Sequence, residues 1–163
     1  MKLSFSTRGW SDLSWEELLS SSLDMKFTGI EVYNLPKFDP MIDRSGPFHK
    51  YQAAATVRTL REKNLKIPCF DTSYDLSAGM ECLPYLLSLM EVAHNTQVPY
   101  VVACALQDQE QLVFDNLAVL LEKAEEMGDV QTLLDLYCGI GTIGISIGDN
   151  AKRTVGIEIV DEA

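Results

Sequence analysis

The chain has 163 residues, of which 47% are hydrophobic and 23% charged, and its formal net charge is −11. These proportions are ordinary for a globular protein and exclude disordered and fibrous classes. A chain of this length buries one substantial core, so we expect a single domain over residues 1–163. The negative charge repels phosphate and no basic stripe is visible, so we expect no nucleic-acid partner.

The sequence carries no signal for a membrane or for a metal. Its apolar stretches, such as residues 98–106, are far below the roughly 18 residues that cross a bilayer, and no apolar signal core follows Met1. We therefore expect a cytoplasmic protein without a membrane partner. The four cysteines and two histidines are scattered, with no Cys-x-x-Cys pair, and predict no metal site.

Short β-rich runs alternate with helical patterns along the whole chain, which is typical of a parallel α/β sheet. Six strands are expected, starting near Lys2, Gly29, Lys66, Tyr100, Thr132 and Thr154. The spacing of these starts fits βα units with right-handed crossovers. The expected fold is an α/β protein with one parallel sheet of about six strands covered by helices.

Four helices are expected between these strands. The first begins with Ser14 and has Glu17 three residues later, which forms a capping box at its N-terminus. We expect this helix to bury Trp15, Leu18, Leu19 and Leu23. The second is expected to start at Pro47 and to run to about Lys63. The third and fourth helices are predicted from leucine-rich apolar residues at helical spacing. Gly128 is expected to end the fourth helix as a C-cap.

Residues 1 to about 128 resemble the N-terminal half of a known barrel family. The segments 2–38, 57–73 and 98–128, which include GIEVY and KIPCFD, are similar to the xylose-isomerase-like sugar phosphate isomerases and epimerases. The resemblance implies a (βα)4 half of a TIM barrel. It also implies a substrate-side acid at Glu31, in the second strand. One carboxylate cannot hold a divalent metal, so we interpret Glu31 as a polar residue at a barrel mouth.

Residues 129–163 resemble a different family. The pattern DLYCGIGTIG followed by GIEIV looks like the S-adenosylmethionine-binding βαβ start of the RNA uracil-5 methyltransferases. Glycines at a strand-to-helix turn let a ligand approach the backbone, and an acid ending the next strand can accept hydrogen bonds from a ribose. The candidate cofactor-binding residues are Asp135, Cys138, Gly139, Gly141, Gly144 and Glu158.

Both resemblances are partial, and this decides the functional expectation. The barrel family takes its metal-binding residues mainly from later strands, and the methyltransferases take their catalytic cysteine and general base from segments beyond Ala163. We therefore expect an engineered or recombined scaffold with a seam near residues 127–132, no catalytic residues and no cofactor.

Two alternatives stay open. One is a module that binds S-adenosylmethionine weakly, and the other is a divergent enzyme similar to the sugar phosphate isomerases and epimerases. Such an enzyme needs acids and histidines at the carboxyl ends of strands, where the sequence supplies only Glu31, Asp71 and Glu158. An exposed sheet edge or half-barrel face could also pair two copies into a homodimer.

Overall fold

The computed structural model describes residues 3–33, 35, 43–128, 133–136 and 154–157. The chain divides into two compact units. The first unit consists of Met1–Tyr74 and Ser88–Cys104, and the second consists of Asp75–Leu87 and Ala105–Ala163. No helix in the described part is both long and apolar enough to cross a membrane.

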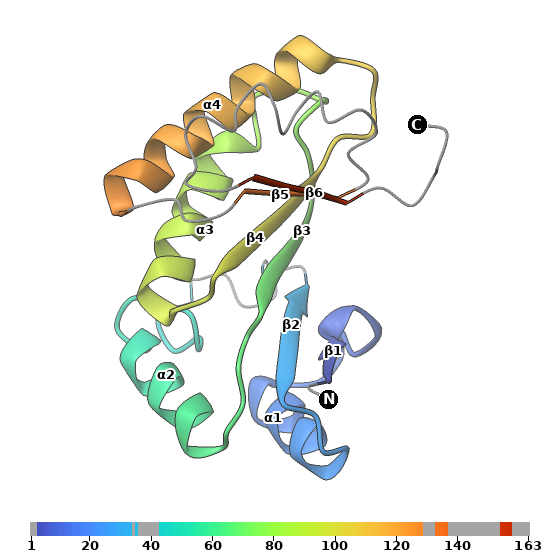
Figure 1. Cartoon of the computed structure of the whole chain (residues 1–163). Coiled ribbons are helices and arrows are strands. Elements are labelled where there is room, and N and C mark those ends of the chain that lie inside the picture. The colour runs from blue at the N-terminus through green and yellow to red at the C-terminus, as the bar shows by residue number, and fades with distance from the viewer. Residues whose placement is uncertain (1–2, 34, 36–42, 129–132, 137–153, 158–163) are drawn as a thin grey trace. The chain divides into compact units, whose positions relative to one another are not determined.

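The first unit is built on a four-stranded sheet in the order β1-β2-β3-β4 (Figure 1). Its strands are β1 (Ser4–Ser6), β2 (Gly29–Tyr33), β3 (Cys69–Asp75) and β4 (Tyr100–Cys104). The helices along the chain are η1 (Thr7–Gly9), α1 (Trp15–Asp24), α2 (Ala53–Glu62), α3 (Leu83–Thr96) and α4 (Glu110–Met127). β1 pairs in parallel with β2, and β2 with β3, as βα units require.

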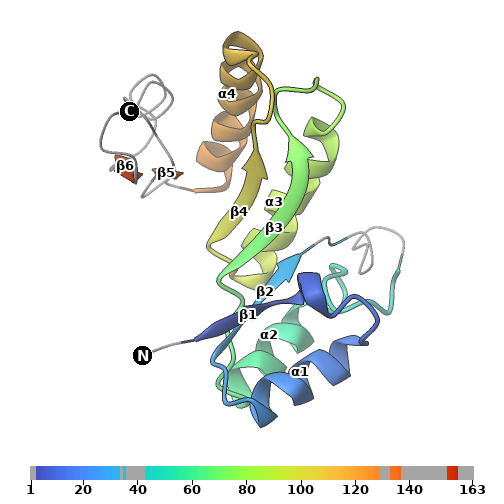
Figure 2. The same ribbon diagram turned by 90° about the vertical axis from the view of Figure 1, so that its right-hand side faces the viewer.

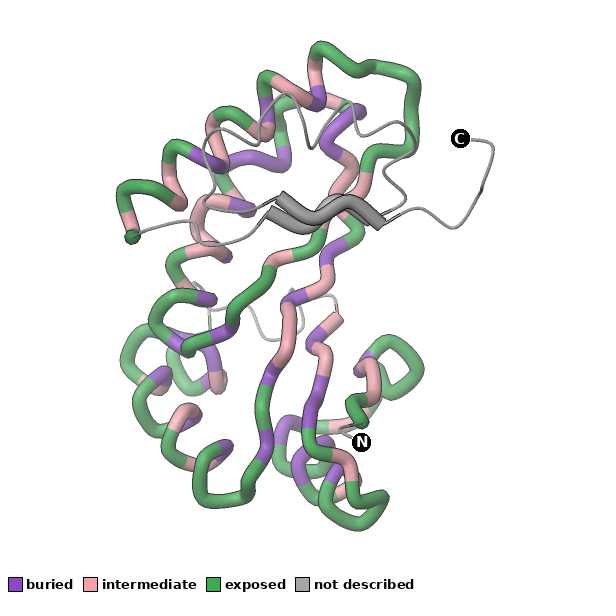
Figure 3. Tube along the Cα trace, in the orientation of Figure 1, coloured by how far each residue is buried: buried purple, intermediate pink, exposed green. Residues whose placement is uncertain are grey.

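One face of this sheet forms the apolar core. Ile30, Val32 and Phe70 are fully buried, and buried positions recur along β2 and β3 (Figure 3). The ring of Phe48 packs edge-on against Phe70, with centroids 5.2 Å apart, and against Trp15 of α1, with centroids 5.1 Å apart. The helices α1 and α2 lie together below β1 and β2 in Figure 2. These aromatic contacts join the first helix to the third strand.

The expected ends of two helices are confirmed. The Ser14 hydroxyl accepts a hydrogen bond from the backbone N–H of Glu17, whose carboxylate accepts one in return from the backbone N–H of Ser14 at 2.7 Å. Gly128 ends α4 with a φ of 138°, in the region where glycine is favoured.

The expected start of the second helix at Pro47 is wrong, because α2 begins at Ala53. Turns occupy the intervening residues, and the Thr56 hydroxyl donates to the carbonyl of Pro47. Proline fits both a first helical turn and a tight turn, so the pattern could not separate them.

The third strand also begins later than expected, at Cys69, while Lys66 forms an isolated bridge with Gly29. Pro68 lacks a backbone N–H and cannot donate a ladder hydrogen bond.

The expectation that about six strands form one sheet is wrong, because the described strands form a four-stranded sheet and a two-stranded sheet. The strands β5 (Leu133–Leu136) and β6 (Thr154–Ile157), which belong to the second unit, pair in parallel with each other and form their own two-stranded sheet. Alternating sequence patterns predict where strands form, but the choice of paired edges depends on tertiary contacts that the pattern does not contain. A parallel sheet with covering helices is confirmed.

In the second unit, α4 anchors the loop that follows β3. Asn116 is fully buried, and its carboxamide nitrogen donates to the carbonyls of Leu76 at 2.8 Å and Gly79 at 3.0 Å. The Ser77 hydroxyl accepts hydrogen bonds from the backbone N–H groups of two residues after β4, including Gln107 at 2.8 Å. These bonds hold the loop through buried polar groups, which are costly to leave unpaired.

Candidate functional site

A group of polar side chains lies on the sheet face opposite the apolar core. Side chains alternate along a strand, so Glu31 and Tyr33 of β2 share a face, as do Cys69 and Asp71 of β3. Tyr33 is opposite Asp71 in the parallel register, which places both pairs on the same face. All four are partly exposed. We call Glu31, Cys69 and Asp71, together with Arg8 of η1, the carboxylate cluster.

The carboxylate cluster lies where parallel α/β proteins place their sites. β2 ends at Tyr33, which pairs with Asp71, so Asp71 is level with the carboxyl end of β2. Side chains at the carboxyl ends of such strands form the active sites of barrel enzymes. The position of the cluster therefore favours a functional role.

The Cys69 thiol contacts Glu31 directly. Its sulfur donates to the Oε2 atom of Glu31 at 3.8 Å. Burial, together with the negative charges of Glu31 and Asp71, raises the pKa of the Cys69 thiol to about 11. The thiol therefore stays protonated at neutral pH and acts as a donor to Glu31, since nucleophilic attack needs the thiolate.

The Asp71 carboxyl is shifted towards its neutral form. Burial raises its pKa, and the negative charge of Glu31 raises it further. The guanidinium of Arg8 and a hydrogen bond from the backbone N–H of Thr72 oppose this shift. Glu31 and Asp71 thus form a pair of carboxyl groups on one face, and Asp71 is shifted towards its protonated form. In such a pair one group can act as the general acid and the other as the general base.

Arg8 brings the positive charge to the cluster. Its guanidinium carbon lies 5.0 Å from the centroid of the Tyr33 ring, within cation–π range. A guanidinium carries five N–H donors and stays charged at all relevant pH values. Arg8 can therefore bind an anionic group or a developing oxyanion beside Asp71.

The described side chains do not form a metal centre of the kind the barrel resemblance implies. No group of three or more histidine, cysteine, aspartate or glutamate side chains suited to a metal ion occurs in the part of the chain that the structure describes. We therefore derive no chemical step through a metal.

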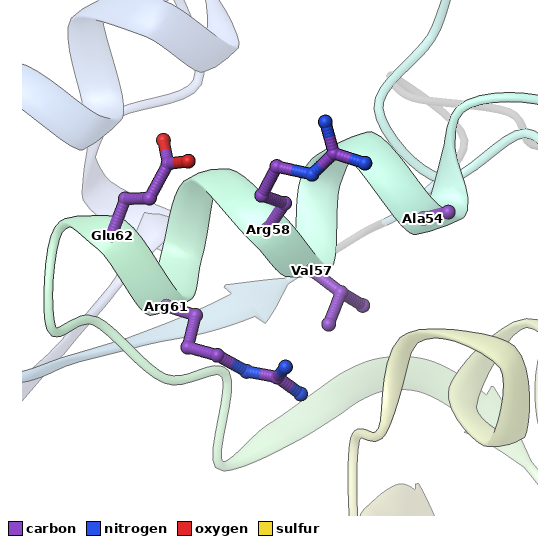
Figure 4. A pocket seen from close by; sticks show the side chains of 5 residues that line it. All are labelled: Ala54, Val57, Arg58, Arg61 and Glu62. Carbon is purple, nitrogen blue, oxygen red and sulfur yellow. The ribbon is translucent and has the colours of Figure 1, made fainter.

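A surface hollow of about 480 Å³ lies away from the carboxylate cluster, on one face of α2 (Figure 4). It is lined by Ala54, Val57, Arg58, Arg61 and Glu62. Two arginines line the hollow. The guanidinium of Arg61 donates to the side-chain oxygen of Gln97 at 3.3 Å, so it already has a protein partner. We place the site at the carboxylate cluster, because the cluster holds two carboxyl groups whereas Glu62 is the single carboxylate that lines the hollow.

Sequence reasoning identified only part of this site. It named Glu31 and Asp71 as acids near strand ends, and the structure brings them to one face. It did not single out Cys69 or Arg8. The alternation in GIEVY and CFDTS, combined with a parallel register, could have placed Cys69 beside Glu31.

The structure describes one of the cofactor-binding residues expected from the sequence. Asp135 is on β5, where its backbone is opposite Gly156 of β6. The others lie outside the described residues: Cys138, Gly139, Gly141, Gly144 and Glu158.

Comparison with curated proteins finds short matches to RNA methyltransferases, while no family model matches the chain. One relative, an uncharacterized RNA methyltransferase of Chlamydia muridarum, is 58% identical over 33 residues, which is 20% of this chain and 8% of the relative. Another, from Chlamydia caviae, is 49% identical over 49 residues, or 28% of this chain and 12% of the relative. The chain thus spans about a tenth of the length of these relatives.

Comparison with solved structures finds barrel proteins. The probable 3-DHS dehydratase AsbF of Bacillus anthracis matches with a TM-score of 0.68 and 15% identity, over 94% of this chain and 62% of its own. A putative xylose isomerase of Rhodospirillum rubrum matches with a TM-score of 0.68 and 11% identity, over 97% of this chain and 65% of its own. The chain spans less than two thirds of both structures. At these identities the likeness shows the fold alone.

Both families expected from the sequence are therefore found among similar proteins. Their joining by recombination in one chain, and an engineered origin, stay predictions. The chain has an α/β fold, with a helix-covered parallel sheet that resembles a xylose-isomerase-like TIM barrel.

Proposed function

We propose that the carboxylate cluster transfers a proton on a small polyhydroxylated carbonyl compound, such as a sugar or sugar phosphate. This is the divergent isomerase or epimerase hypothesis. The observation that carries it is the placement of Glu31 and Asp71 on one sheet face, where burial and the charge of Glu31 raise the pKa of Asp71. The fold likeness agrees with this reading but does not by itself assign an activity.

Isomerisation and epimerisation of such compounds move a proton at a carbon next to a carbonyl group. This chemistry needs one group that accepts a proton and another that donates one. In the proposed site, Glu31 accepts the proton from carbon, and Asp71, shifted towards its neutral form, donates one to the carbonyl oxygen. Arg8 stabilises the negative charge that develops on that oxygen.

Cys69 has a supporting role in this proposal. Its protonated thiol donates to Glu31 and leaves the second carboxylate oxygen available to the substrate. A hydrogen bond to the charged form holds the orientation of a carboxylate, which matters because a misplacement of about 1 Å can cost about a hundredfold in rate. Replacing Cys69 with serine keeps a donor, whereas replacing it with alanine removes it.

Interconversion of sugars tests the proposal. The purified chain is incubated with a panel of aldoses, ketoses and their phosphates, and the products are followed by carbon-13 NMR. We expect turnover above background for at least one compound and a loss of about a hundredfold or more in Glu31→Gln and Asp71→Asn. Glu62→Gln is the matched control, because Glu62 is an exposed carboxylate on α2 and is not part of the cluster. Interconversion rates that are equal in the wild type, in all variants and in buffer would contradict the proposal and favour a scaffold without catalytic activity.

A second candidate function is weak binding of S-adenosylmethionine. It is favoured by the matches to RNA methyltransferases and by the parallel pairing of β5 with β6, which places Asp135 opposite Gly156. Because the matches cover only 8% and 12% of the two relatives, we expect an affinity weaker than roughly 100 μM. Thermal melting with millimolar ligand tests it, and a shift lost in Glu158→Ala would support it. Submicromolar binding in calorimetry would contradict the expected weakness.

A further inference from the structure

We infer that Thr7 is a positioning residue, which ties η1 to the end of β2 and so holds Arg8 over Tyr33, where its charge balances the carboxyl pair. The inference deepens the proposed proton-transfer function, and part of its test does not depend on that function.

The first observation is a side-chain clamp at Thr7. The paired ladder between β1 and β2 reaches Ser6, which is opposite Glu31. The hydroxyl of Thr7 then donates to the carbonyl of Tyr33 at 3.3 Å and accepts from the backbone N–H of Tyr33 at 2.9 Å. Thr7 is only 5% exposed. A hydroxyl can donate and accept at once, so this side chain takes the place of further strand pairing.

The second observation is that the clamp sets the position of the next residue. Arg8 follows Thr7 directly, and its backbone N–H donates to the Ser6 hydroxyl at 3.2 Å. The Thr7 carbonyl accepts from the backbone N–H of Trp10 at 2.9 Å, which closes the turn. Arg8 is exposed, and a long exposed side chain is free to sample many rotamers. A fixed backbone and the Tyr33 ring restrict that choice.

The third observation is electrostatic. Among the described residues, the charged and titratable groups around Asp71 are Glu31 and Tyr33 on β2, the protonated thiol of Cys69 on β3 and Arg8 on η1. Arg8 supplies the positive charge among them. If Arg8 moved away, Asp71 and Glu31 would face each other without this counter-charge, and the pKa of Asp71 would rise further.

A titration of the ligand-free chain tests the inference. The carboxyl carbon of Asp71 is followed by carbon-13 NMR across pH in the wild type, Thr7→Val, Thr7→Ser and Arg8→Gln. Valine matches threonine in shape but has no hydroxyl, whereas serine keeps it. We expect a higher Asp71 midpoint in Thr7→Val and Arg8→Gln, and a wild-type midpoint in Thr7→Ser.

The double variant Thr7→Val with Arg8→Gln shows whether Thr7 acts through Arg8. If it does, the double variant has the same midpoint as Arg8→Gln alone, because the charge that Thr7 positions is already gone. Additive shifts would overturn the inference. An unchanged midpoint in Thr7→Val, alongside a raised one in Arg8→Gln, would also overturn it and leave Thr7 with a purely structural role.

Tyr33→Leu keeps the test decisive if Thr7→Val does not fold. This variant removes the ring beneath Arg8 but keeps the backbone groups that Thr7 contacts, and we expect it to raise the Asp71 midpoint. A wild-type midpoint would show that the ring does not hold Arg8 and would refute the inference. Because these measurements need no substrate, they can succeed or fail independently of the sugar interconversion assay.

Discussion

Replacing Phe70 with alanine removes the centre of the apolar core. Phe70 is fully buried, and its ring packs edge-on against Phe48, which in turn packs against Trp15. Truncation of a buried phenylalanine costs about 3–5 kcal/mol through lost burial and the cavity left behind. An edge-on aromatic pair adds roughly 0.5–1.5 kcal/mol beyond burial, so we expect a loss near the upper end of that range.

The assay is equilibrium unfolding in urea, followed by far-ultraviolet circular dichroism. A loss of this size is large against the total stability of about 5–15 kcal/mol that is usual for folded domains, so the variant should be partly unfolded without denaturant. Tyr51→Ala is the matched control, because Tyr51 is 70% exposed and should change the unfolding free energy by about 0.5 kcal/mol or less. A change below about 1 kcal/mol for Phe70→Ala would refute the reasoning that this ring is the centre of the core.

Three further predictions follow from single side chains. Ser14→Ala should lower the unfolding free energy by about 1 kcal/mol in urea titrations, because α1 loses its capping box; no change would contradict the cap. Cys69 should react with iodoacetamide at pH 8 at least about a hundredfold more slowly than glutathione, since its pKa is about 11; mass spectrometry measures the rates, and similar rates would contradict its burial. Asp71→Asn should gain stability relative to the wild type as pH rises from about 4, because a carboxyl with a raised folded-state pKa stabilises the fold only while it is protonated. Parallel melting curves of the two proteins across pH would refute that shift.

Local signals in the sequence predicted local structure well. The spacing of Ser14 and Glu17 predicted the capping box, and Gly128 predicted the end of the fourth helix, because each depends on residues close together in the chain. Alternating patterns also located the strands to within a few residues. The first helix was also expected to bury Leu23, which is wrong, because Leu23 is 39% exposed.

Features that depend on distant residues were harder to predict. The pairing of β5 with β6 in a sheet of their own depends on which strand edges meet. The site depends on register as well: Glu31 and Asp71 were recognised separately, but only the pairing of Tyr33 with Asp71 shows that they share a face. The role of Arg8 follows from a 3-10 turn and an aromatic ring, neither of which has a strong sequence pattern.

Incorporation of solvent deuterium tests the central claim most directly, because it detects removal of a proton from carbon even when no product is released. The chain is incubated in deuterium oxide with the sugar and sugar phosphate panel. NMR then measures the loss of signal from the proton bound to the carbon next to the carbonyl group. We expect exchange above background in the wild type and in Glu62→Gln, and a loss of about a hundredfold in Glu31→Gln. Exchange at the buffer rate for every compound, or undiminished exchange in Glu31→Gln, would contradict it.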